Sequence, residues 1–456
     1  MPATWPRALA ALFPRGIVAL DRPTLDAHAG DAWFATHRPD AVVFPRTAQE
    51  VAKVLRFANG RKIPVTARGA GRGYVGGCVP QRGGIAVSFA RMNRILEINA
   101  VDGIGVVQPG VITGEFQARA RREGLLYPPD PASLKECSLG GNVATNAGGP
   151  RCLKYGVTRH YVLGLQVALA DGTLVRVGGR TQKNKSGFDL VGIFVGAEGL
   201  LGLVTEITLR LIPAPPARAV LSASFKNASI AAACVQRIFH EGFLPSALEL
   251  ADRFTLEAAR RHLGAEHLPP GDAHLLVEID GQAASVRDEA GTLRELLKAA
   301  GALEIVTATR EAECERLWGL RREFSASLKA TGLTKLNEDI CVPRSRLVDL
   351  FAFTARLQKK HRVEIASFGH AGDGNIHVNI MADMTKRGVK ARADRALDDL
   401  FRQVIAWGGA ITGEHGIGLA KLPWWPQAAS PELRRLHGMI KGALDPRRIL
   451  NPGKFV

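Results

Sequence analysis

Hydrophobic and polar positions follow different patterns in the two halves of the 456-residue chain. In the first half, a T-x-x-E capping box at Thr47 precedes an amphipathic segment that predicts a helix as far as Gly60, and the apolar run IPVTA (63–67) predicts a buried strand. After Pro213, short apolar strands such as HLLVEID (274–280) alternate with helical patterns. We therefore predict a strand-rich first domain and a second domain of α+β class, built on an antiparallel sheet.

Glycine-rich stretches separate the predicted strands of the first half. They are ARGAGRGYVGG (67–77), PPDPASLKECSLGGNVATNAGG (128–149) and LVGIFVGAEGLLGLVTEITLRL (190–211), the last of which follows a hairpin with a D-G turn at Asp171. We predict that the second stretch is one loop, because its prolines, asparagines and small residues let backbone approach a flat ligand closely. Together the three stretches indicate one extended ligand that crosses the domain.

The first stretch contains the spacing G-x-G-x-x-G between positions 71 and 76. In a Rossmann unit this motif opens directly into a helix whose N-terminus holds a pyrophosphate. Here it continues into CVPQRGG and the predicted strand IAVSF (85–89), which argues against a nicotinamide site. Two interpretations remain: an anion nest for a diphosphate, with Arg68 and Arg72 beside it, or a turn that binds no ligand.

The chain is strongly basic, since 60 Lys and Arg against 43 Asp and Glu give a formal net charge of +17. Such a charge attracts nucleic acid, anionic membrane surfaces or anionic small molecules. The basic residues are spread along the chain and are not clustered with aromatic residues, so a nucleic-acid-binding protein is the weaker alternative. No transmembrane span is predicted, because the apolar stretch 190–209 carries two glutamates among its glycines.

The six cysteines form no C-x-x-C pair. This argues against an iron–sulfur or zinc–thiolate site in this chain and fits a reducing compartment. The first 20 residues are apolar but are interrupted by Pro6 and Pro14. We expect them to be domain structure, with a transit peptide as the alternative.

The motif FGHAGDGNIHVNI (368–380) predicts a hairpin in the second half, with a tight turn at AGDGN. His370 and His377 then lie on opposite arms, close enough to share a ligand, and Asn379 points to the same face as His377 because strand side chains alternate. Two such imidazoles suit a divalent metal if a third ligand arrives from elsewhere. The alternative is a pair of packed histidines without a metal.

The stretch ITGEHGIG (411–418) offers Glu414 as that third ligand and places His415 beside it, between glycines. A further segment, 317–343, contains Arg321 and Ser325 one helical turn apart and Lys335 before the predicted strand EDICVP. These cations are candidates for a clamp on a substrate carboxylate. The alternative interpretation is that these residues are solvated charges on an amphipathic helix and bind no substrate.

Taken together, ARGAGRGYVGG, DPASLKECSLGGNVATNAGG, KYGVTRH (154–160), GAEGLLGLVTEITL, G-H-x-G-D-G-N-x-H and G-E-H-G-x-G resemble the motifs of FAD-linked oxidases of the vanillyl-alcohol-oxidase type. More narrowly, they resemble the D-2-hydroxyacid dehydrogenase branch, which includes the flavin subunit of glycolate oxidase, D-lactate dehydrogenase and D-2-hydroxyglutarate dehydrogenase. The resemblance implies a two-subdomain FAD-binding domain (1–214), an α+β cap domain for substrate and metal (215–424) and a C-terminal segment (425–456) that returns to the FAD domain.

The resemblance also implies roles for individual residues. His370, His377 and Glu414 match ligands of a divalent metal, Zn or Mn; His415 matches the catalytic base; and Arg321, Ser325, Lys335 and Asn379 are the implied substrate-binding residues. The residues implied to bind FAD are Arg68, Gly69, Ala70, Gly71, Arg72, Gly73, Tyr74, Pro131, Ser138, Gly141, Asn142, Thr145, Asn146, Glu198, Gly202, Val204 and Asn451. One departure is visible after the second glycine of the first loop, where relatives usually have a Thr and a small residue and this chain has Arg72, Gly73 and Tyr74.

The function implied is oxidation of a small D-2-hydroxy acid, of the D-lactate, glycolate or D-2-hydroxyglutarate class, with hydride transfer to flavin N5. The expected electron acceptor is external: an iron–sulfur subunit, a quinone or an electron-transfer flavoprotein. We expect the protein in the cytoplasm, either free or at the membrane periphery. Two alternatives keep the fold: a flavin-dependent alkyl transferase of the ether-lipid synthase branch, and a non-catalytic subunit that binds FAD.

Overall fold

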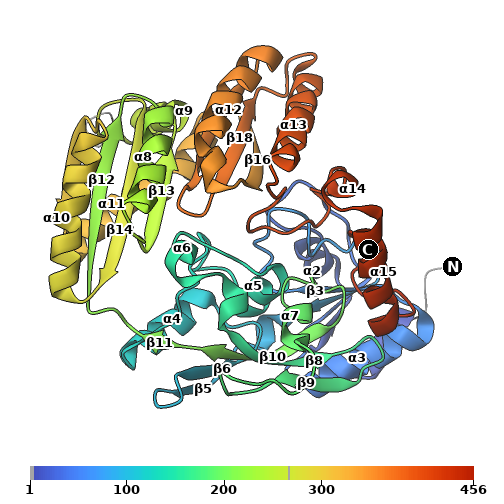
Figure 1. The fold of residues 1–456 in the computed structure, drawn as a ribbon. Helices are drawn as coiled ribbons and strands as arrows, with labels where there is room; N and C mark the ends of the chain where they lie inside the picture. Colours follow the sequence, from blue (N-terminus) through green and yellow to red (C-terminus); the bar gives the residue numbers. More distant parts are fainter. Residues whose placement is uncertain (1–4, 265–267) are drawn as a thin grey trace. The chain divides into compact units, whose positions relative to one another are not determined.

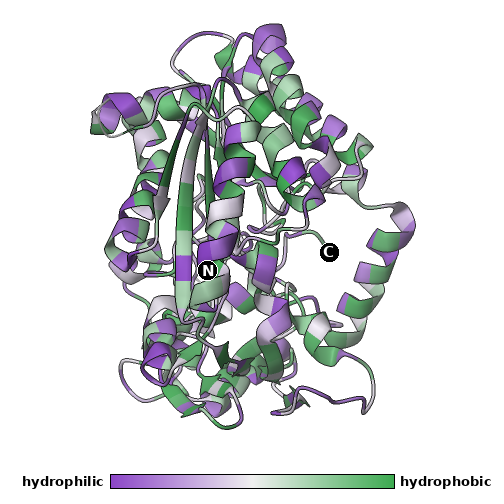
Figure 2. Cartoon of the chain, turned by 60° about the vertical axis from the view of Figure 1, so that its left-hand side comes forward, coloured by the Kyte–Doolittle hydropathy of each residue, from purple (hydrophilic) through white to green (hydrophobic). Residues whose placement is uncertain are grey.

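The computed structural model describes residues 5–264 and 268–456, which divide into two compact units (Figure 1). Unit 1 consists of Met1–Gly148, Gly156–Ala214 and Glu414–Val456, and unit 2 consists of Gly149–Tyr155 and Pro215–Gly413. Along the helices, hydrophobic and hydrophilic residues alternate, as expected for elements that bury one side against a sheet (Figure 2).

Unit 1 contains two main sheets. The first has the order β1-β2-β4-β3, in which β4 pairs in parallel with both β2 and β3, and the second is an antiparallel sheet of order β5-β6-β10-β8-β9. A short antiparallel pair joins β7 and β11. The strands are β1 Val18–Ala19, β2 Ala41–Val43, β3 Val65–Arg68, β4 Ile85–Ser88, β5 Ile95–Asn99, β6 Ile104–Val107, β7 Leu125–Leu126, β8 Val162–Ala168, β9 Leu174–Gly178, β10 Leu203–Arg210 and β11 Ile212–Pro213.

The helices of unit 1 are mostly short. They are α1 Trp5–Ala11, α2 Arg22–Ala27, α3 Ala48–Arg61, α4 Thr113–Arg122, α5 Leu139–Thr145, α7 Leu190–Phe194, α14 Trp425–Ala428 and α15 Pro431–Leu444. The predicted cap of α3 is present, since the Thr47 hydroxyl accepts a hydrogen bond from the Glu50 amide at 3.2 Å. The C-terminal segment pairs beside β3, where the Val65 amide donates to the Ile449 carbonyl at 2.8 Å.

The second glycine-rich stretch is not one loop, so that prediction was wrong. Residues 139–145 form α5, because the Ser138 hydroxyl accepts a hydrogen bond from the Gly141 amide and so begins the helix. The small residues that suggested a loop also fit a seven-residue helix. By contrast, β3 runs into an irregular loop and not into a helix, which confirms that the first stretch is not a Rossmann motif.

Unit 2 is built on a seven-stranded sheet of order β15-β12-β14-β13-β17-β18-β16, in which all neighbouring strands are antiparallel. The strands are β12 Ala217–Phe225, β13 Ala247–Ala251, β14 Ala273–Gly281, β15 Glu304–Ala308, β16 Thr334–Cys341, β17 Glu364–His370 and β18 Asn375–Ala382. This sheet confirms the predicted α+β architecture of the second half.

Two groups of helices pack against this sheet. In one group, α9 and α11 contact each other and share a core with Phe324 and Phe368; in the other, α8 contacts both α10 and α12, and α12 contacts α13. The helices are α6 Cys152–Tyr155, α8 Ala228–His240, α9 Arg253–Leu263, α10 Ala283–Ala299, α11 Glu311–Ala330, α12 Leu347–His361 and α13 Val389–Ala406. Among the described residues, no helix is both long enough and apolar enough to cross a membrane.

Candidate active site

The first glycine-rich loop of unit 1 leaves β3 at Arg68 and is shaped by that side chain. Gly71 and Gly76 have φ values of 70° and 71°, which glycine adopts without strain. A Cβ at Gly71 would lie 2.2 Å from Nη2 of Arg68, so a side chain there would displace the guanidinium from its place against the loop. Arg68 Nη1 donates in turn to the Gly30 carbonyl at 2.5 Å, which places a fixed positive charge beside the loop.

The first two glycine-rich stretches are in contact. A Cβ on Gly69 would lie 2.4 Å from Oγ of Ser138 and 3.4 Å from the amide nitrogen of Gly141. The backbone of the first loop therefore packs directly on the N-terminal turn of α5. Two segments that are about 70 positions apart in the sequence form one glycine-lined surface.

The side chains of α5 mostly hold local backbone. Asn142 is buried and donates to Thr113 Oγ1 at 2.7 Å, whereas Asn146, in the left-handed region with a φ of 53°, accepts from the Arg159 amide at 2.9 Å. Thr145 donates from its hydroxyl to the Gly141 carbonyl at 3.3 Å. We infer that any ligand contact from this segment uses its backbone more than these side chains.

Other residues that were predicted to bind cofactor lie nearby in unit 1. Arg72 forms an exposed ion pair with Glu136 at 2.9 Å, and the Pro131 carbonyl accepts from the Leu134 amide at 2.8 Å. Ala70 and Gly73 belong to the first loop, and Gly202 and Val204 lie at the start of β10. A Cβ on Gly202 would lie 2.5 Å from Cγ1 of Val167, so this glycine is required for packing.

Glu198 joins separate segments of unit 1. It is nearly buried, has a φ of 49°, and accepts hydrogen bonds from the amides of Ile417 and Gly418 at 2.7 and 2.8 Å. Burial raises the pKa of this carboxyl, and the two amide donors partly oppose the rise. Asn451 donates from its side-chain amide to the carbonyls of Glu198 and Gly77, at 2.8 and 3.0 Å, so the C-terminal segment closes the same assembly.

This network positions the motif that carries His415. The ring centroids of His415 and Tyr74 are 5.5 Å apart, with an interplanar angle of 35°. The candidate base therefore lies beside the first glycine-rich loop. Glu414 is also in unit 1, and the residue that precedes it, Gly413, is the last residue of unit 2.

The histidine motif in unit 2 forms the predicted hairpin. His370 ends β17 and His377 lies in β18, and their ring centroids are 5.7 Å apart. Strand register places Phe368 opposite His377, and Asn379 shares the face of His377 because it is two residues further along β18. The predicted pair of converging imidazoles is thus confirmed as a geometric arrangement.

A buried carboxylate that we did not predict binds one member of this pair, His370. Glu249 in β13 is in register with His370, and its Oε1 lies 2.5 Å from His370 Nδ1. Arg321 in α11 donates from Nε to Oε2 of the same carboxylate at 2.6 Å. Burial opposes ionisation of Glu249, but the charges and hydrogen bonds of His370 and Arg321 prevail and lower its pKa to about 2.

Asp339 is a second buried carboxylate on this face. It lies opposite His377 in the β16–β18 pair, and its Oδ1 accepts from the side-chain Nδ2 of Asn375 at 2.7 Å. Its Oδ2 accepts from the Thr412 hydroxyl at 2.9 Å and from the Gly413 amide at 3.0 Å. Asp339 therefore fixes the chain immediately before Glu414 next to the histidine hairpin.

Two cations lie over the ring of Phe368. Arg321 Cζ is 4.8 Å and Lys335 Nζ is 5.7 Å from the ring centroid. We predicted Lys335 before the strand, but it lies inside β16, so that prediction was wrong. Lys335 donates to Ser325 Oγ at 2.9 Å. Burial lowers the pKa of Lys335 to about 8, and the nearby cations Lys329 and Arg321 act in the same direction.

Asn379 is fully buried beside these groups. Its side-chain nitrogen donates to the carbonyls of Ala366 and His377, both at 3.0 Å. Its Oδ1 has no hydrogen-bond partner among the described residues, so it could accept a hydrogen bond from a substrate hydroxyl.

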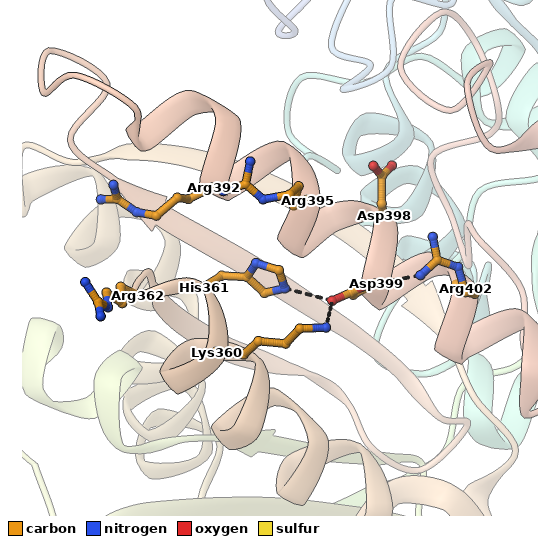
Figure 3. Close-up of a pocket in the computed structure, with 8 residues that line it drawn as sticks. All are labelled: Lys360, His361, Arg362, Arg392, Arg395, Asp398, Asp399 and Arg402. Atoms are coloured by element: carbon orange, nitrogen blue, oxygen red, sulfur yellow. Dashed lines mark hydrogen bonds and ion pairs between the residues drawn. The ribbon is translucent and has the colours of Figure 1, made fainter.

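A separate hollow of about 580 Å³ lies between α12 and α13 (Figure 3). It is lined by Lys360, His361, Arg362, Arg392, Arg395, Asp398, Asp399 and Arg402. Asp399 accepts from Lys360 and His361 at 2.7 Å and from Arg402 at 3.0 Å. The hollow contains none of the predicted site residues, and Arg362 in its lining comes shortly before β17, a strand of roughly 20 Å that ends at His370. We therefore assign the chemistry to the histidine hairpin and not to this hollow.

Reasoning from the sequence missed Glu249 and Asp339. A detectable signal existed for Glu249, since a lone carboxylate in the apolar strand ALELA is costly to bury without a partner. Asp339 lies two residues after Asn337 in β16, a strand that contains several other polar residues and so gives no comparable signal. Their partners come from other strands and helices, so no local pattern could identify those partners.

Comparison with known families gives two matches that together span most of the chain. Residues 214–455 match the family of FAD linked oxidases, C-terminal domain, and residues 39–178 match the FAD binding domain family. The first match alone covers more than half of the chain.

Curated relatives are similar over nearly the full length. The chain is 38% identical over 417 residues to glycolate oxidase subunit GlcD of Bacillus subtilis, covering 91% of this chain and 89% of that protein. It is 34% identical over 451 residues to D-lactate dehydrogenase of Anaerostipes hadrus, covering 97% and 95%. It is 36% identical over 416 residues to D-lactate dehydrogenase of Archaeoglobus fulgidus, covering 91% of each.

Solved structures share the fold at lower identity. p-Cresol methylhydroxylase with substrate bound has a TM-score of 0.81 and 20% identity, covering 99% of this chain and 96% of that chain. Alkyldihydroxyacetonephosphate synthase has a TM-score of 0.76 and 18% identity, covering 98% and 84%. These two likenesses show the fold alone.

Proposed function

Because the chain belongs to the FAD-linked oxidases, and within them to the glycolate oxidase and D-lactate dehydrogenase type, we propose that it oxidises a small D-2-hydroxy acid to the 2-oxo acid, using FAD and a divalent metal. The observation that carries the proposal is the face of the unit 2 sheet on which Arg321 and Lys335 lie over Phe368, next to the paired imidazoles of His370 and His377. A cationic clamp beside two histidines suits a carboxylate with an adjacent hydroxyl.

The glycine-lined surface of unit 1 fits FAD. The crowding at Gly69, against the start of α5, and at Gly71, against the Arg68 guanidinium, disfavours side chains along the loop, so backbone amides can approach a diphosphate. Arg68 supplies a fixed positive charge beside this loop. When bound, FAD supplies the acceptor for the hydride that leaves the substrate α-carbon.

The donor set around the hairpin fits a divalent metal held by His370, His377 and Glu414. A histidine whose Nδ1 faces a carboxylate, as His370 does with Glu249, is the usual arrangement of a metal-binding imidazole. Gly413 is bound to Asp339 opposite His377, and Glu414 follows it by one peptide bond, which spans about 3.8 Å between Cα atoms. A divalent metal, when bound, polarises the substrate hydroxyl and carboxylate and lowers the hydroxyl pKa.

The remaining steps belong to the side chains of the chain itself. Arg321 and Lys335 bind the substrate carboxylate and orient the α-hydrogen. His415 accepts the hydroxyl proton as the α-hydrogen departs as hydride, so the alcohol becomes a carbonyl and the two electrons leave with the hydride. Before this proton leaves, Asn379 Oδ1 accepts a hydrogen bond from the substrate hydroxyl; this role is supported by the lack of any other partner for that oxygen among the described residues.

Electrons then pass to an acceptor outside the chain, because the sequence has no C-x-x-C pair for an iron–sulfur centre of its own. We propose a partner that carries such a centre, a quinone or an electron-transfer flavoprotein. The net charge of +17 favours an acidic partner surface.

An anaerobic absorbance titration tests the proposal. The purified protein, reconstituted with FAD, is mixed with D-lactate, L-lactate, glycolate or D-2-hydroxyglutarate before and after chelation. We expect one of the D-acids or glycolate to bleach the visible flavin band, the bleaching to disappear with chelator, and Zn²⁺ or Mn²⁺ to restore it. A flavin band that none of these acids bleaches would reject the substrate class, and bleaching that survives complete metal removal would reject the metal.

A further inference from the structure

Glu249 occupies a position where a carboxylate is expensive. It lies in the middle of the strand ALELA, its side chain is 1% exposed, and its neighbours in β13 are apolar and buried. Removing a carboxylate from water costs free energy that an ion pair often fails to recover. Replacing a buried ion pair by well-packed apolar residues is therefore often neutral or stabilising. Stability alone therefore gives little reason for a glutamate at this point.

The two oxygens of Glu249 serve two different candidate functions. Oε1 faces His370 Nδ1 at 2.5 Å, whereas Oε2 receives Nε of Arg321 at 2.6 Å and Nη2 at 2.5 Å. His370 is a candidate metal ligand and Arg321 a candidate carboxylate clamp. One carboxylate thus links the two halves of the substrate site.

We propose that Glu249 is a positioning residue that holds the proton of His370 on Nδ1 and fixes the orientation of the Arg321 guanidinium. This inference rests on the proposed function for the roles of those two residues. It assigns Glu249 no contact with the substrate.

Glu249 selects the tautomer of His370. A carboxylate facing Nδ1 favours the imidazole that carries its proton there, and that tautomer has its lone pair on Nε2, the nitrogen that can bind a metal. Without Glu249, the proton distributes between the two nitrogens, and the ring loses the bond that sets its plane. Metal affinity then falls even though every ligand is present.

Glu249 also occupies one edge of the Arg321 guanidinium. Glu249 takes the edge formed by Nε and Nη2, and Phe368 lies against the guanidinium, with Cζ 4.8 Å from its ring centroid. No described residue binds Nη1 of Arg321. The guanidinium is therefore held by one edge while its Nη1 end can receive a second carboxylate, which is how a bidentate clamp is pre-oriented.

Unit 2 contains a matched control for this role. Glu278 is also a buried carboxylate on the side of the sheet that packs against α11, and it receives Arg151 at 2.8 Å, Arg218 at 2.8 Å and Trp318 Nε1 at 2.7 Å. Like Glu249 it is paired with arginine, but among the described residues it bonds to no candidate metal ligand or substrate residue. Replacing either glutamate should lower stability, but only Glu249→Gln should change the chemistry of the site.

The experiment compares E249Q and E278Q with the wild type in three measurements. They are the affinity for Zn²⁺ by competition with a chromophoric chelator, the histidine tautomers in metal-free protein by ¹⁵N NMR, and the KM for the substrate. For E249Q we expect a loss of metal affinity of about 10- to 100-fold, the range found for such supporting partners, together with a shift of one histidine away from its Nδ1-protonated form and a raised KM. E278Q should retain the wild-type tautomer and metal affinity.

Other outcomes decide against the inference. An E249Q protein with wild-type tautomers and metal affinity would overturn it, as would equal losses in E249Q and E278Q. If E249Q does not fold, E249D keeps the charge but withdraws it by one methylene, and wild-type values in that variant would also overturn it. A wild-type protein that binds neither Zn²⁺ nor Mn²⁺ would reject the metal of the proposed function, while the metal-free tautomer of His370 would still decide the role of Glu249.

Discussion

Lys335 in β16 donates a hydrogen bond of 2.9 Å to the hydroxyl of Ser325 in α11, and its ammonium lies 5.7 Å from the centroid of the Phe368 ring. The pair combines a half-buried ammonium with a neutral hydroxyl acceptor, which does not cancel its charge. This leaves the full positive charge available to an anionic substrate.

The depressed pKa of Lys335 predicts a pH dependence of substrate binding. Lys335 is positively charged below about pH 8 and loses this charge as the pH rises through that value. KM should therefore be constant at pH 6–7 and rise above pH 8. The measurement is KM against pH for the wild type and K335R. Because arginine stays charged, K335R should lack this rise, and an identical rise in both proteins would show that another group causes it.

Arg321→Ala should lower kcat/KM for the substrate strongly. A hydrogen-bonded pair that involves charged groups contributes about 1.5–3 kcal/mol, so the loss should be about 10- to 150-fold, mainly through KM. Arg322 is the matched control, because it is half exposed and forms an ion pair with Glu315 at 2.8 Å on the same helix. Equal kinetics for R321A and R322A would contradict the assignment of Arg321.

Gly71→Ala should abolish or greatly weaken FAD binding. The added Cβ would lie 2.2 Å from Nη2 of Arg68 in a backbone conformation that costs an alanine about 1–2 kcal/mol. The FAD content of the purified protein measures the effect. Gly77→Ala is the control, since its Cβ would meet only Val75 Cγ2 at 4.0 Å, and normal FAD content in both variants would refute the role of the first loop.

Lys441→Met should destabilise unit 1 by about 3–5 kcal/mol, because it leaves a buried charge uncompensated. Lys441 is 2% exposed and donates to Asp445 at 2.7 Å and to the carbonyls of Leu200 and Leu450 at 2.7 and 2.8 Å. Denaturant unfolding measures the change. As a control, K386M removes an exposed ion pair with Asp383 and should lower the free energy of unfolding by less than about 0.5 kcal/mol. Similar losses in both variants would contradict a stabilising role for the buried Lys441 charge.

The sequence by itself determined the features that depend on neighbours along the chain. The Thr47 cap, the absence of a helix after the first glycine-rich loop, the histidine hairpin and the antiparallel sheet all follow from local spacing and side-chain alternation, and the structure confirms them. The error at residues 139–145 is also local, since small residues serve a loop and a short helix equally well until Ser138 provides the cap.

Only the tertiary structure decided which charges meet. Glu249 is separated from Arg321 by 72 residues and from His370 by 121, and Glu198 from Ile417 by 219. Such pairs are set by strand order and helix packing, and a carboxylate in an apolar strand does not indicate which distant cation or amide will compensate its burial. The physical reason is that hydrophobic periodicity specifies a buried face, whereas the partners across that face depend on how separate segments pair.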